Sequence, residues 1–451
     1  MTVRDKLDQI LISSSQPDFK EQINHLHWKL LSKARFGGFD PQSEKNRQTV
    51  LDIIRDVSQH GDEAVAKYTE KYDHVKLSPK QLRVSKEQLE KAHTEIKKKE
   101  PKLLASIRQV IKNIRKYQKE IFVGNSKNFG ATGIRYTPIK RVGICVPGAS
   151  APLPSTVIMC AVPAQVAGVK EIVVVSPPRY KNSIHPTTLA VCYELKIDEV
   201  YRIGGAQAVA LLAGAKNTKI RKVDKIVGPG NEWVQTAKLM QLGYVGIDSI
   251  AGPSEVLIIA NDKANPAWVA ADMLSQVEHA PGSAVVVTAS REFGRKVLVE
   301  VKKQVKQLRR TKETMECLIA YSRIAVFNNM DNVIECANEF AAEHLEIQCG
   351  DESRKIADRI INAGAIFIGD YSPVAVGDYW AGPSHTLPTG MTARFFSALT
   401  SNDFIKSTSI IEYDKKKLAE SAEDIIRLAE AEGLDAHAKS IWLRLCLRQD
   451  E

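Results

Sequence analysis

The sequence predicts an α/β protein with two parallel-sheet units in tandem, flanked by helical segments at both ends. Its 451 residues suffice for two or three domains, and its 44% hydrophobic and 26% charged residues are typical of a globular protein. From about residue 141, short apolar runs rich in Val and Ile alternate with helical stretches. This rhythm indicates parallel sheets that are covered by helices on both faces.

The first third of the chain predicts four helices. The stretch QTVLDIIRDVSQHGDEAVAKYTEKYD reads as two helices interrupted at His60-Gly61-Asp62. The stretch SKEQLEKAHTEIKKKEPKLLASIRQVIKNIRKYQKE reads as two more, because Pro101 suits the first turn of a new helix. The tail beyond about residue 400 is also predicted to be helical.

Two series of strands follow the helical third. The first series is RVGICVPG, EIVVVSP, DEVYRIGG and VDKIVGPG, and the second is EVLIIAN, GSAVVVTAS, RIAVFN and GAIFIGD. We place the division between the two units near AGPSE, residues 251–255. Ligands bind at strand ends in such sheets, and the loops there carry Gln207, Asn231 and Ser254 at their polar tips. Ordinary βα turns explain the same Gly and Pro content, and no loop has the GxGxxG pattern of a dinucleotide site.

The composition narrows the class of protein. The net charge of +10 raises the question of nucleic acid, but the basic residues are mixed with acids on helical patterns, which favours solvated helix faces over an anion-binding patch. Seven cysteines, an odd number at irregular spacing without a CxxC motif, argue against a disulfide framework and a thiolate zinc site, and they indicate reduced thiols in the cytoplasm. We expect Cys145 and Cys160 to be buried small hydrophobes. The sequence has no apolar run long enough to span a membrane, and its N-terminus is too charged for a secretory signal.

Several histidines and carboxylates are candidates for a metal site. Gln276 and His279 stand three residues apart near the end of the predicted helix NPAWVAADMLSQVEHAPGS, although a histidine that balances the helix dipole is the simpler interpretation. Asp378 lies in the Gly- and Pro-rich loop AVGDYWAGPSHTLPTG, and His437 lies in AEAEGLDAHAK. Together the four residues would form a sulfur-free set suited to zinc. His385 and Glu432 occupy the same two segments, and surface or turn positions explain all of them equally well.

The segment EFAAEHLEI places Glu343 and His344 side by side. We expect them at the end of an amphipathic helix, where neighbouring side chains do not face each other. They either serve one site from two directions or simply end the helix.

Nine motifs together resemble the histidinol dehydrogenase family, in the family's order from about residue 60 almost to the C-terminus. They are GDEAVAKYTEKYD, PGASAPLPSTVIM, GGAQAVALLA, VDKIVGPGN, IAGPSEVLIIA, DMLSQVEH, AAEHLEI, VGDYWAGPSHTLPT and EGLDAH. The resemblance implies two incomplete Rossmann-like domains with parallel sheets and smaller helical termini. The implied division is a segment 1–40, a first domain of 41–141 with 255–399, a second domain of 142–254, and a segment 400–451 that contributes to the partner's site.

The resemblance also implies the activity and the residues that perform it. The family oxidises L-histidinol to L-histidinaldehyde and then to L-histidine with two NAD, as a zinc-bearing homodimer with one ion per subunit. Motif by motif, the metal ligands are Gln276, His279, Asp378 and, from the partner subunit, His437. These four residues also match substrate contacts, as do Ser254, His344, His385 and Glu432. Gln207, Asn231 and Cys145 match cofactor contacts, although Cys145 stands where the family usually has tyrosine.

The chemistry of this reaction gives the adjacent pair two tasks. A base must take the hydroxyl proton while hydride leaves to NAD, and a histidine suits that step near neutral pH. The aldehyde then requires an added water and a second base, which a carboxylate with a raised pKa can supply. We therefore assign His344 to the alcohol step and Glu343 to the aldehyde step. A dehydrogenase for another polar alcohol such as a sulfonated diol, a metal-dependent hydrolase and a non-catalytic binding protein are the alternatives.

Overall fold

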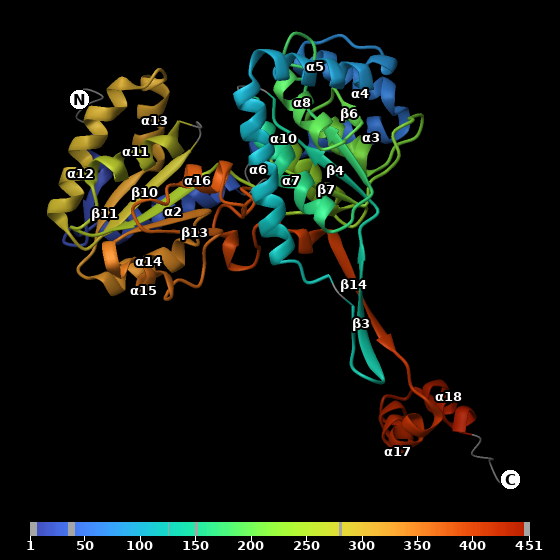
Figure 1. Ribbon diagram of the computed structural model, residues 1–451. Helices are drawn as coiled ribbons and strands as arrows, with labels where there is room; N and C mark the ends of the chain where they lie inside the picture. The colour runs from blue at the N-terminus through green and yellow to red at the C-terminus, as the bar shows by residue number, and fades with distance from the viewer. Residues whose placement is uncertain (1–6, 35–40, 125, 149–151, 279–281, 446–451) are drawn as a thin grey trace.

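The computed structural model describes residues 7–34, 41–124, 126–148, 152–278 and 282–445. Figure 1 shows two lobes side by side and an arm that carries the last two helices away from both of them. Each lobe is a parallel sheet between layers of helices, and the third, antiparallel sheet forms the arm. The predicted α/β fold with two parallel sheets is confirmed.

The first lobe is built on a six-stranded parallel sheet. Its strands, in spatial order, are β1 (Leu11–Ser13), β11 (Arg323–Val326), β10 (Ser283–Thr288), β9 (Glu255–Ala260), β12 (His344–Gln348) and β13 (Ala365–Ile368). One face packs against α11 (Pro266–Val277), α12 (Arg291–Gln304) and α13 (Thr311–Tyr321), and the other against α2 (Phe19–Ala34), α14 (Met330–Phe340) and α15 (Ser353–Ala357). Because both faces are covered, all the residues of β9 and β10 are buried.

Strand β12 presents a polar stripe to one face of this sheet. His344 pairs with Val256 and Leu345 with Leu257, and Val256 and Leu257 belong to the cores on opposite faces. Since successive side chains alternate between faces, every second residue from His344 onward points to the α11 face. A strand HLEIQ was not among the strands that the sequence predicts, nor was β1.

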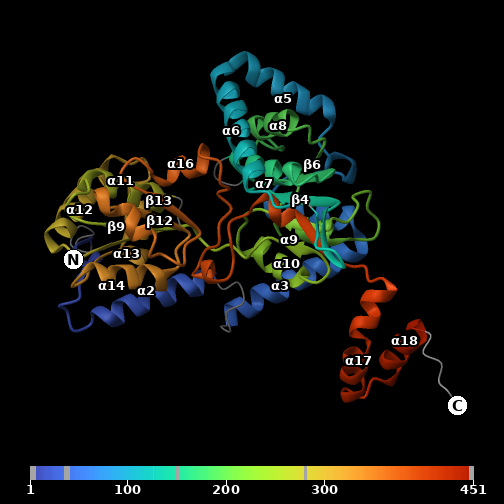
Figure 2. The ribbon, with the colours of Figure 1, turned by 60° about the horizontal axis from the view of Figure 1, so that its bottom comes forward.

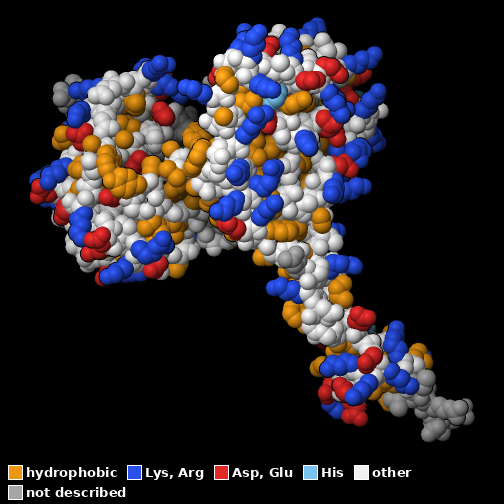
Figure 3. Space-filling view, viewed as in Figure 1, with side chains coloured by type: hydrophobic (Ala, Val, Ile, Leu, Met, Phe, Trp, Pro, Cys, Tyr) orange, Lys and Arg blue, Asp and Glu red, His pale blue; other side chains and the backbone are white. Residues whose placement is uncertain are grey.

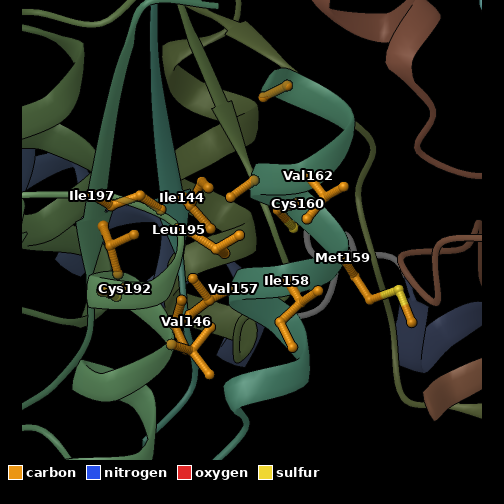
Figure 4. Packing of buried hydrophobic residues seen from close by; sticks show 14 of the residues in the cluster. Ile144, Val146, Val157, Ile158, Met159, Cys160, Val162, Cys192, Leu195 and Ile197 are labelled. Atoms are coloured by element: carbon orange, nitrogen blue, oxygen red, sulfur yellow. The ribbon is translucent and has the colours of Figure 1, made fainter. Parts of the chain in front are cut away.

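The second lobe is built on a five-stranded parallel sheet. Its strands, in spatial order, are β6 (Glu199–Tyr201), β5 (Glu171–Val175), β4 (Arg141–Cys145), β7 (Lys225–Val227) and β8 (Gly246–Ile247). One face packs against α5 (Lys86–Lys99), α6 (Pro101–Glu120), α7 (Pro154–Val166) and α8 (Pro186–Glu194), and the other against α3 (Pro41–His60), α4 (Asp62–Asp73), α9 (Gly205–Ala213) and α10 (Glu232–Gln241). Figure 4 shows Cys160 within the first of these cores, which confirms that it is a buried hydrophobe.

The four predicted N-terminal helices are confirmed, but they do not pack where the family resemblance placed them. Helix α3 ends at His60, Gly61 takes a φ of 54°, and Pro101 opens α6. All four helices pack on other helices of the second lobe: α3 and α4 on α9, α5 on α8, and α6 on α7. Residues 41–120 therefore belong with 142–254, and the expected grouping of 41–141 with 255–399 is wrong. The physical reason is that their apolar side chains join the two cores of the second lobe.

The two terminal segments are not wholly helical either. Leu11–Ser13 adds strand β1 to the edge of the six-stranded sheet, beside β11. After residue 400 the chain forms strand β14 (Ile405–Ile411), which pairs antiparallel with β3 (Thr132–Pro138), while β2 (Lys127–Asn128) lies on the other side of β3. Only then do α17 (Lys415–Ala431) and α18 (Asp435–Leu445) follow, and both stand clear of the two lobes in two views (Figures 1 and 2).

Three features of the described residues bear on the class of protein: the distribution of surface charge, the helices and the cysteines. On the face in Figure 3, Lys and Arg are interspersed with Asp and Glu rather than gathered into one tract. No helix within the described residues is long and apolar enough to cross a membrane. The six cysteines in the same residues are all free thiols, at positions 145, 160, 192, 317, 336 and 349.

Candidate active site

Glu343 and His344 lie at the start of a buried strand, not at the end of a helix. Helix α14 ends at Phe340, and Ala341 takes a φ of 44°, which turns the chain into β12. Both side chains are buried, at 5% and 4% exposure. The imidazole Nδ1 of His344 is 3.5 Å from Oε2 of Glu343. The two groups therefore face each other, contrary to the helical interpretation.

A third buried carboxylate, Glu255, holds this pair in place. The backbone N–H of Glu255 donates to Oε2 of Glu343 over 2.9 Å, and the backbone N–H of Glu343 donates to Oε1 of Glu255 over 3.2 Å. The carbonyl oxygen of Glu255 lies 3.1 Å from Nδ1 of His344, so Nδ1 carries the proton and donates it. These three hydrogen bonds join the amino ends of β9 and β12 at the residues proposed for catalysis, Glu343 and His344.

The other ring nitrogen of His344 is available for chemistry. Nε2 is buried and has no hydrogen-bond partner, and the nearest carboxylate oxygen is Oδ1 of Asp378 at 3.7 Å. Asp378 lies in the short helix α16 (Val374–Tyr379) and is partly exposed. A buried polar atom without a partner is costly, so its presence in a native protein is consistent with a catalytic role.

Burial and charge shift the titration of these groups. Burial raises the pKa of Glu343 to about 7, against the attraction of His344. Burial and the charge of Glu343 raise the pKa of Glu255 to about 8. Burial lowers the pKa of His344, but the carboxylates of Glu343 and Asp378 outweigh it and raise that pKa to about 9. Acid and base therefore titrate near neutral pH within one site.

The four candidate metal ligands are only partly brought together. Gln276 is buried in the last turn of α11, and Asn265 caps the start of that helix. His279 lies outside the described residues. His437 is exposed on α18, at the end of the arm. Accordingly, the described residues contain no cluster of three histidines, cysteines or carboxylates that would hold a metal within one chain.

Two of the remaining candidate substrate contacts, Ser254 and His385, lie near the buried pair, whereas Glu432 lies on the arm. The Ser254 side chain lies beside Glu343 and opposes the rise in the pKa of that carboxyl. His385 is close enough to Asp378 and His344 to feel their charges, although burial is the main reason that its pKa is lowered. Its loop is anchored to the second lobe through Oγ of Ser384, which donates to the carbonyl of Met159 over 3.2 Å. Glu432, in contrast, is exposed at the end of α17, on the arm.

The three candidate cofactor residues line one cavity of about 300 Å³ in the second lobe. Cys145 ends β4, Gln207 lies in the first turn of α9, and Asn231 caps α10 by accepting from the N–H of Val234. All three positions are at the carboxyl ends of parallel strands, where the sequence predicts ligand loops. Burial raises the pKa of the Cys145 thiol to about 12, so this side chain offers a small neutral wall.

Glycines line this cavity, and a buried ion pair of Lys238 and Asp248 holds a neighbouring loop. Gly148, Gly204 and Gly205 line it, and a Cβ at Gly204 would lie 2.8 Å from Pro177. The neighbouring loop is held at Gly228, whose N–H donates to Asp248 over 2.7 Å and whose carbonyl accepts from Lys238 over 3.1 Å. A rigid glycine-lined cavity at the first turn of α9 suits a pyrophosphate group.

The candidate catalytic residues lie at the amino ends of strands, whereas the candidate cofactor residues lie at carboxyl ends. Glu255, His344 and Ser254 stand at the amino ends of β9 and β12, and the AGPSE segment links the end of β8 in the second lobe to the start of β9 in the first. The segments that carry them cross between the lobes: the N–H of Ala251 donates to Gln235 on α10 over 3.2 Å. The site is therefore at the junction of the two lobes.

Sequence reasoning missed Glu255. The available signal was a single carboxylate at the head of the apolar run EVLIIA, where a strand expected to be buried would enclose it. A buried carboxylate requires partners, and those partners, Glu343 and Gly390, are distant in sequence.

Comparison with known proteins identifies the family. The sequence model of histidinol dehydrogenase matches residues 40–445. A histidinol dehydrogenase of Rhodopirellula baltica is 44% identical over 88% of this chain and 86% of its own, and one of Oceanobacillus iheyensis is 45% identical over 88% and 92%. The crystal structure of histidinol dehydrogenase from Elizabethkingia anophelis superposes with a TM-score of 0.86 at 33% identity, covering 96% of this chain and 97% of that one. This chain belongs to the histidinol dehydrogenase family.

Proposed function

We propose that this protein oxidises L-histidinol to L-histidinaldehyde and then to L-histidine, with two molecules of NAD. The observation that carries the proposal is the buried pair of Glu343 and His344, with the Nε2 atom of His344 unpartnered, in a chain of this family. Two successive oxidations need two bases, and the site supplies one imidazole and one carboxylate within 3.5 Å of each other.

In the alcohol step, His344 takes the proton of the substrate hydroxyl. Its Nδ1 is fixed by the carbonyl of Glu255, so only Nε2 can act as the base. The hydrogen bond to the carbonyl also sets the orientation of the ring and stabilises the protonated form. His344 must enter this step neutral.

In the aldehyde step, Glu343 takes a proton from the water that adds to the carbonyl carbon. Its carboxylate is oriented by the N–H of Glu255 and by the side chain of Ser254. A carboxylate with a pKa of about 7 is a stronger base than an exposed one and is still ionised in part at neutral pH.

The cavity in the second lobe fits NAD. Its glycines leave room for the backbone to approach a pyrophosphate, and Gln207 and Asn231 offer amides to the cofactor. When bound, NAD accepts the hydride of each oxidation. The Cys145 side chain borders the same space.

Asp378 beside His344 and the buried Gln276 are side chains that fit zinc. The family resemblance implies that His279 and His437 of the partner subunit would complete a nitrogen and oxygen set without sulfur. When bound, the ion would position the substrate's imidazole and amine and neutralise the Asp378 carboxylate, which lowers the pKa of His344 toward neutrality. Glu432 and His437 are exposed on the arm of this chain, which supports a homodimer with a shared site.

An NADH-coupled assay with a zinc measurement on the same sample tests the proposal. We expect two NADH per L-histidinol, dependence on a bound divalent ion, and no turnover without NAD. A simple alcohol and a sulfonated diol serve as comparison substrates. The absence of NADH formation from L-histidinol by metal-loaded protein would contradict the proposal, and turnover without NAD would indicate a hydrolase instead.

A further inference from the structure

Glu255 joins three parts of the site through one side chain and one peptide unit. Its Oε1 accepts hydrogen bonds from two backbone N–H groups, that of Glu343 over 3.2 Å and that of Gly390 over 3.0 Å. Gly390 belongs to the loop that carries His385, and this loop is tied again to the amino end of β9 because the N–H of Gly252 donates to Oγ1 of Thr389. With 5% of its surface exposed, Glu255 is enclosed by the groups it holds.

The side chain and the backbone of Glu255 hold different atoms of the site, because its backbone N–H donates to the Glu343 carboxylate whereas its side chain accepts from the Glu343 peptide N–H. The backbone carbonyl fixes the His344 ring, and every substitution at this position keeps that carbonyl. The side-chain oxygen fixes the Glu343 peptide, and a substitution removes or moves it. The backbone of Glu343 is also closely packed against Gly364. A Cβ added at Gly364 would lie only 2.5 Å from the Glu343 carbonyl oxygen.

We propose that the Glu255 side chain is a positioning residue for the aldehyde step, which sets the Glu343 peptide and the His385 loop at a fixed separation. The proposal rests on the proposed function. It follows that the reach of the side-chain acceptor matters more than its charge. Removing a well-placed acceptor leaves two buried N–H groups without a partner and lets the general base shift. A shift of about 1 Å can cost about 100-fold in rate.

Two conservative variants separate reach from charge. Glu255→Gln keeps an acceptor oxygen at the same distance from the backbone and removes the charge. Glu255→Asp keeps the charge and withdraws the acceptor by one methylene. L-Histidinaldehyde is given to each variant with NAD, which reports the aldehyde oxidation, and with NADH, which reports the reverse of the alcohol step.

We expect Glu255→Asp to lower kcat of aldehyde oxidation about 100-fold, to lower aldehyde reduction less than about 10-fold, and to leave KM for the aldehyde nearly unchanged. Glu255→Gln should retain aldehyde oxidation within about 10-fold of wild type. A merely structural role would lower both directions by one factor in both variants.

A matched control comes from the second lobe. Gln118 is buried, and its Oε1 accepts from the N–H of Ser401 over 2.8 Å. Gln118→Asn withdraws a buried acceptor by the same one methylene and should leave the ratio of oxidation to reduction at its wild-type value. Equal loss of both directions in Glu255→Asp, or a Glu255→Gln variant worse than Glu255→Asp, would overturn the positioning role. A wild-type protein that forms no NADH from L-histidinol would instead contradict the proposed function.

Discussion

At the scale of single residues, burial gives Glu343 and His344 their chemistry. In water a glutamate is too weak a base to activate a water molecule efficiently, whereas burial raises the pKa of Glu343 to about 7. The pKa of His344 is raised for a different reason. Burial alone would lower it, but two neighbouring carboxylates raise it. The polar stripe on β12 continues at Glu346, whose Oε1 accepts from the N–H of Val374 over 2.9 Å at the start of the helix that bears Asp378.

The division of labour predicts a partial reaction in Glu343→Gln. The amide keeps the shape of the side chain but cannot take a proton from water. We expect aldehyde oxidation to fall by about 100-fold or more while the alcohol step is largely spared. The measurement is NADH formed per L-histidinol in a single turnover, which should fall from two toward one. His344→Asn is the companion variant and should abolish the first NADH; an equal loss of both steps in Glu343→Gln would show that the two tasks are not divided.

At the scale of elements, the sequence predicts helices better than it predicts this site. Helix α6 has an apolar stripe and Pro101 in its first turn, and both signals are local. Strand β12 was missed because His344, Glu346 and Gln348 break the expected apolar run. Partners from distant elements satisfy only part of this polarity: Glu346 accepts from the N–H of Val374, and the Gln348 amide donates to Asp272 over 2.7 Å. The arm strand β14 was missed because its mostly exposed run IKSTSII lacks a buried face.

Helix α2 provides a pH-dependent contact at this scale. His27 packs against the ring of Phe340 on α14, with ring centroids 4.3 Å apart, and its Nε2 is buried without a partner. Burial, aided by the charge of Arg394, lowers the pKa of His27 to about 4. The unfolded chain therefore binds a proton that the folded chain excludes between about pH 6.5 and 4, so stability is complete above 6.5 and falls as the pH decreases through that range.

We expect the urea midpoint of the first lobe to fall between pH 7 and pH 5 by more in the wild type than in His27→Leu. His25→Leu is the matched control, because His25 is exposed on the same helix. Equal pH dependence in His27→Leu and in the wild type would contradict this role.

At the scale of the whole molecule, the arm exposes apolar side chains that no other part of the same chain covers within the described residues. Helices α17 and α18 share a small core of their own, yet Leu428 and Leu443 are 68% and 69% exposed there. The same arm carries Glu432 and His437. A second copy of the chain that receives this arm would cover the apolar side chains and complete the metal site.

Subunit mixing tests the shared site. Subunits with Glu343→Gln and subunits with His437→Ala should each be inactive in the complete reaction. After they are unfolded and refolded together, a mixed dimer would have one site with an intact Glu343 and an intact His437. Random pairing then predicts recovery of about a quarter of wild-type activity. The measurement is NADH formation before and after mixing, with each variant refolded alone as the control; no recovery would place His437 in the site of its own chain.

The pairing of β1 with β11 has a consequence for how the chain is made. Strand β1 is synthesised before the five-stranded lobe, but the strand beside which it lies, β11, is synthesised only after that whole lobe. That lobe is largely continuous in sequence and can fold as a unit while synthesis proceeds. Strand β1 thus remains without its sheet until β11 has been synthesised, and this edge of the first lobe closes only then.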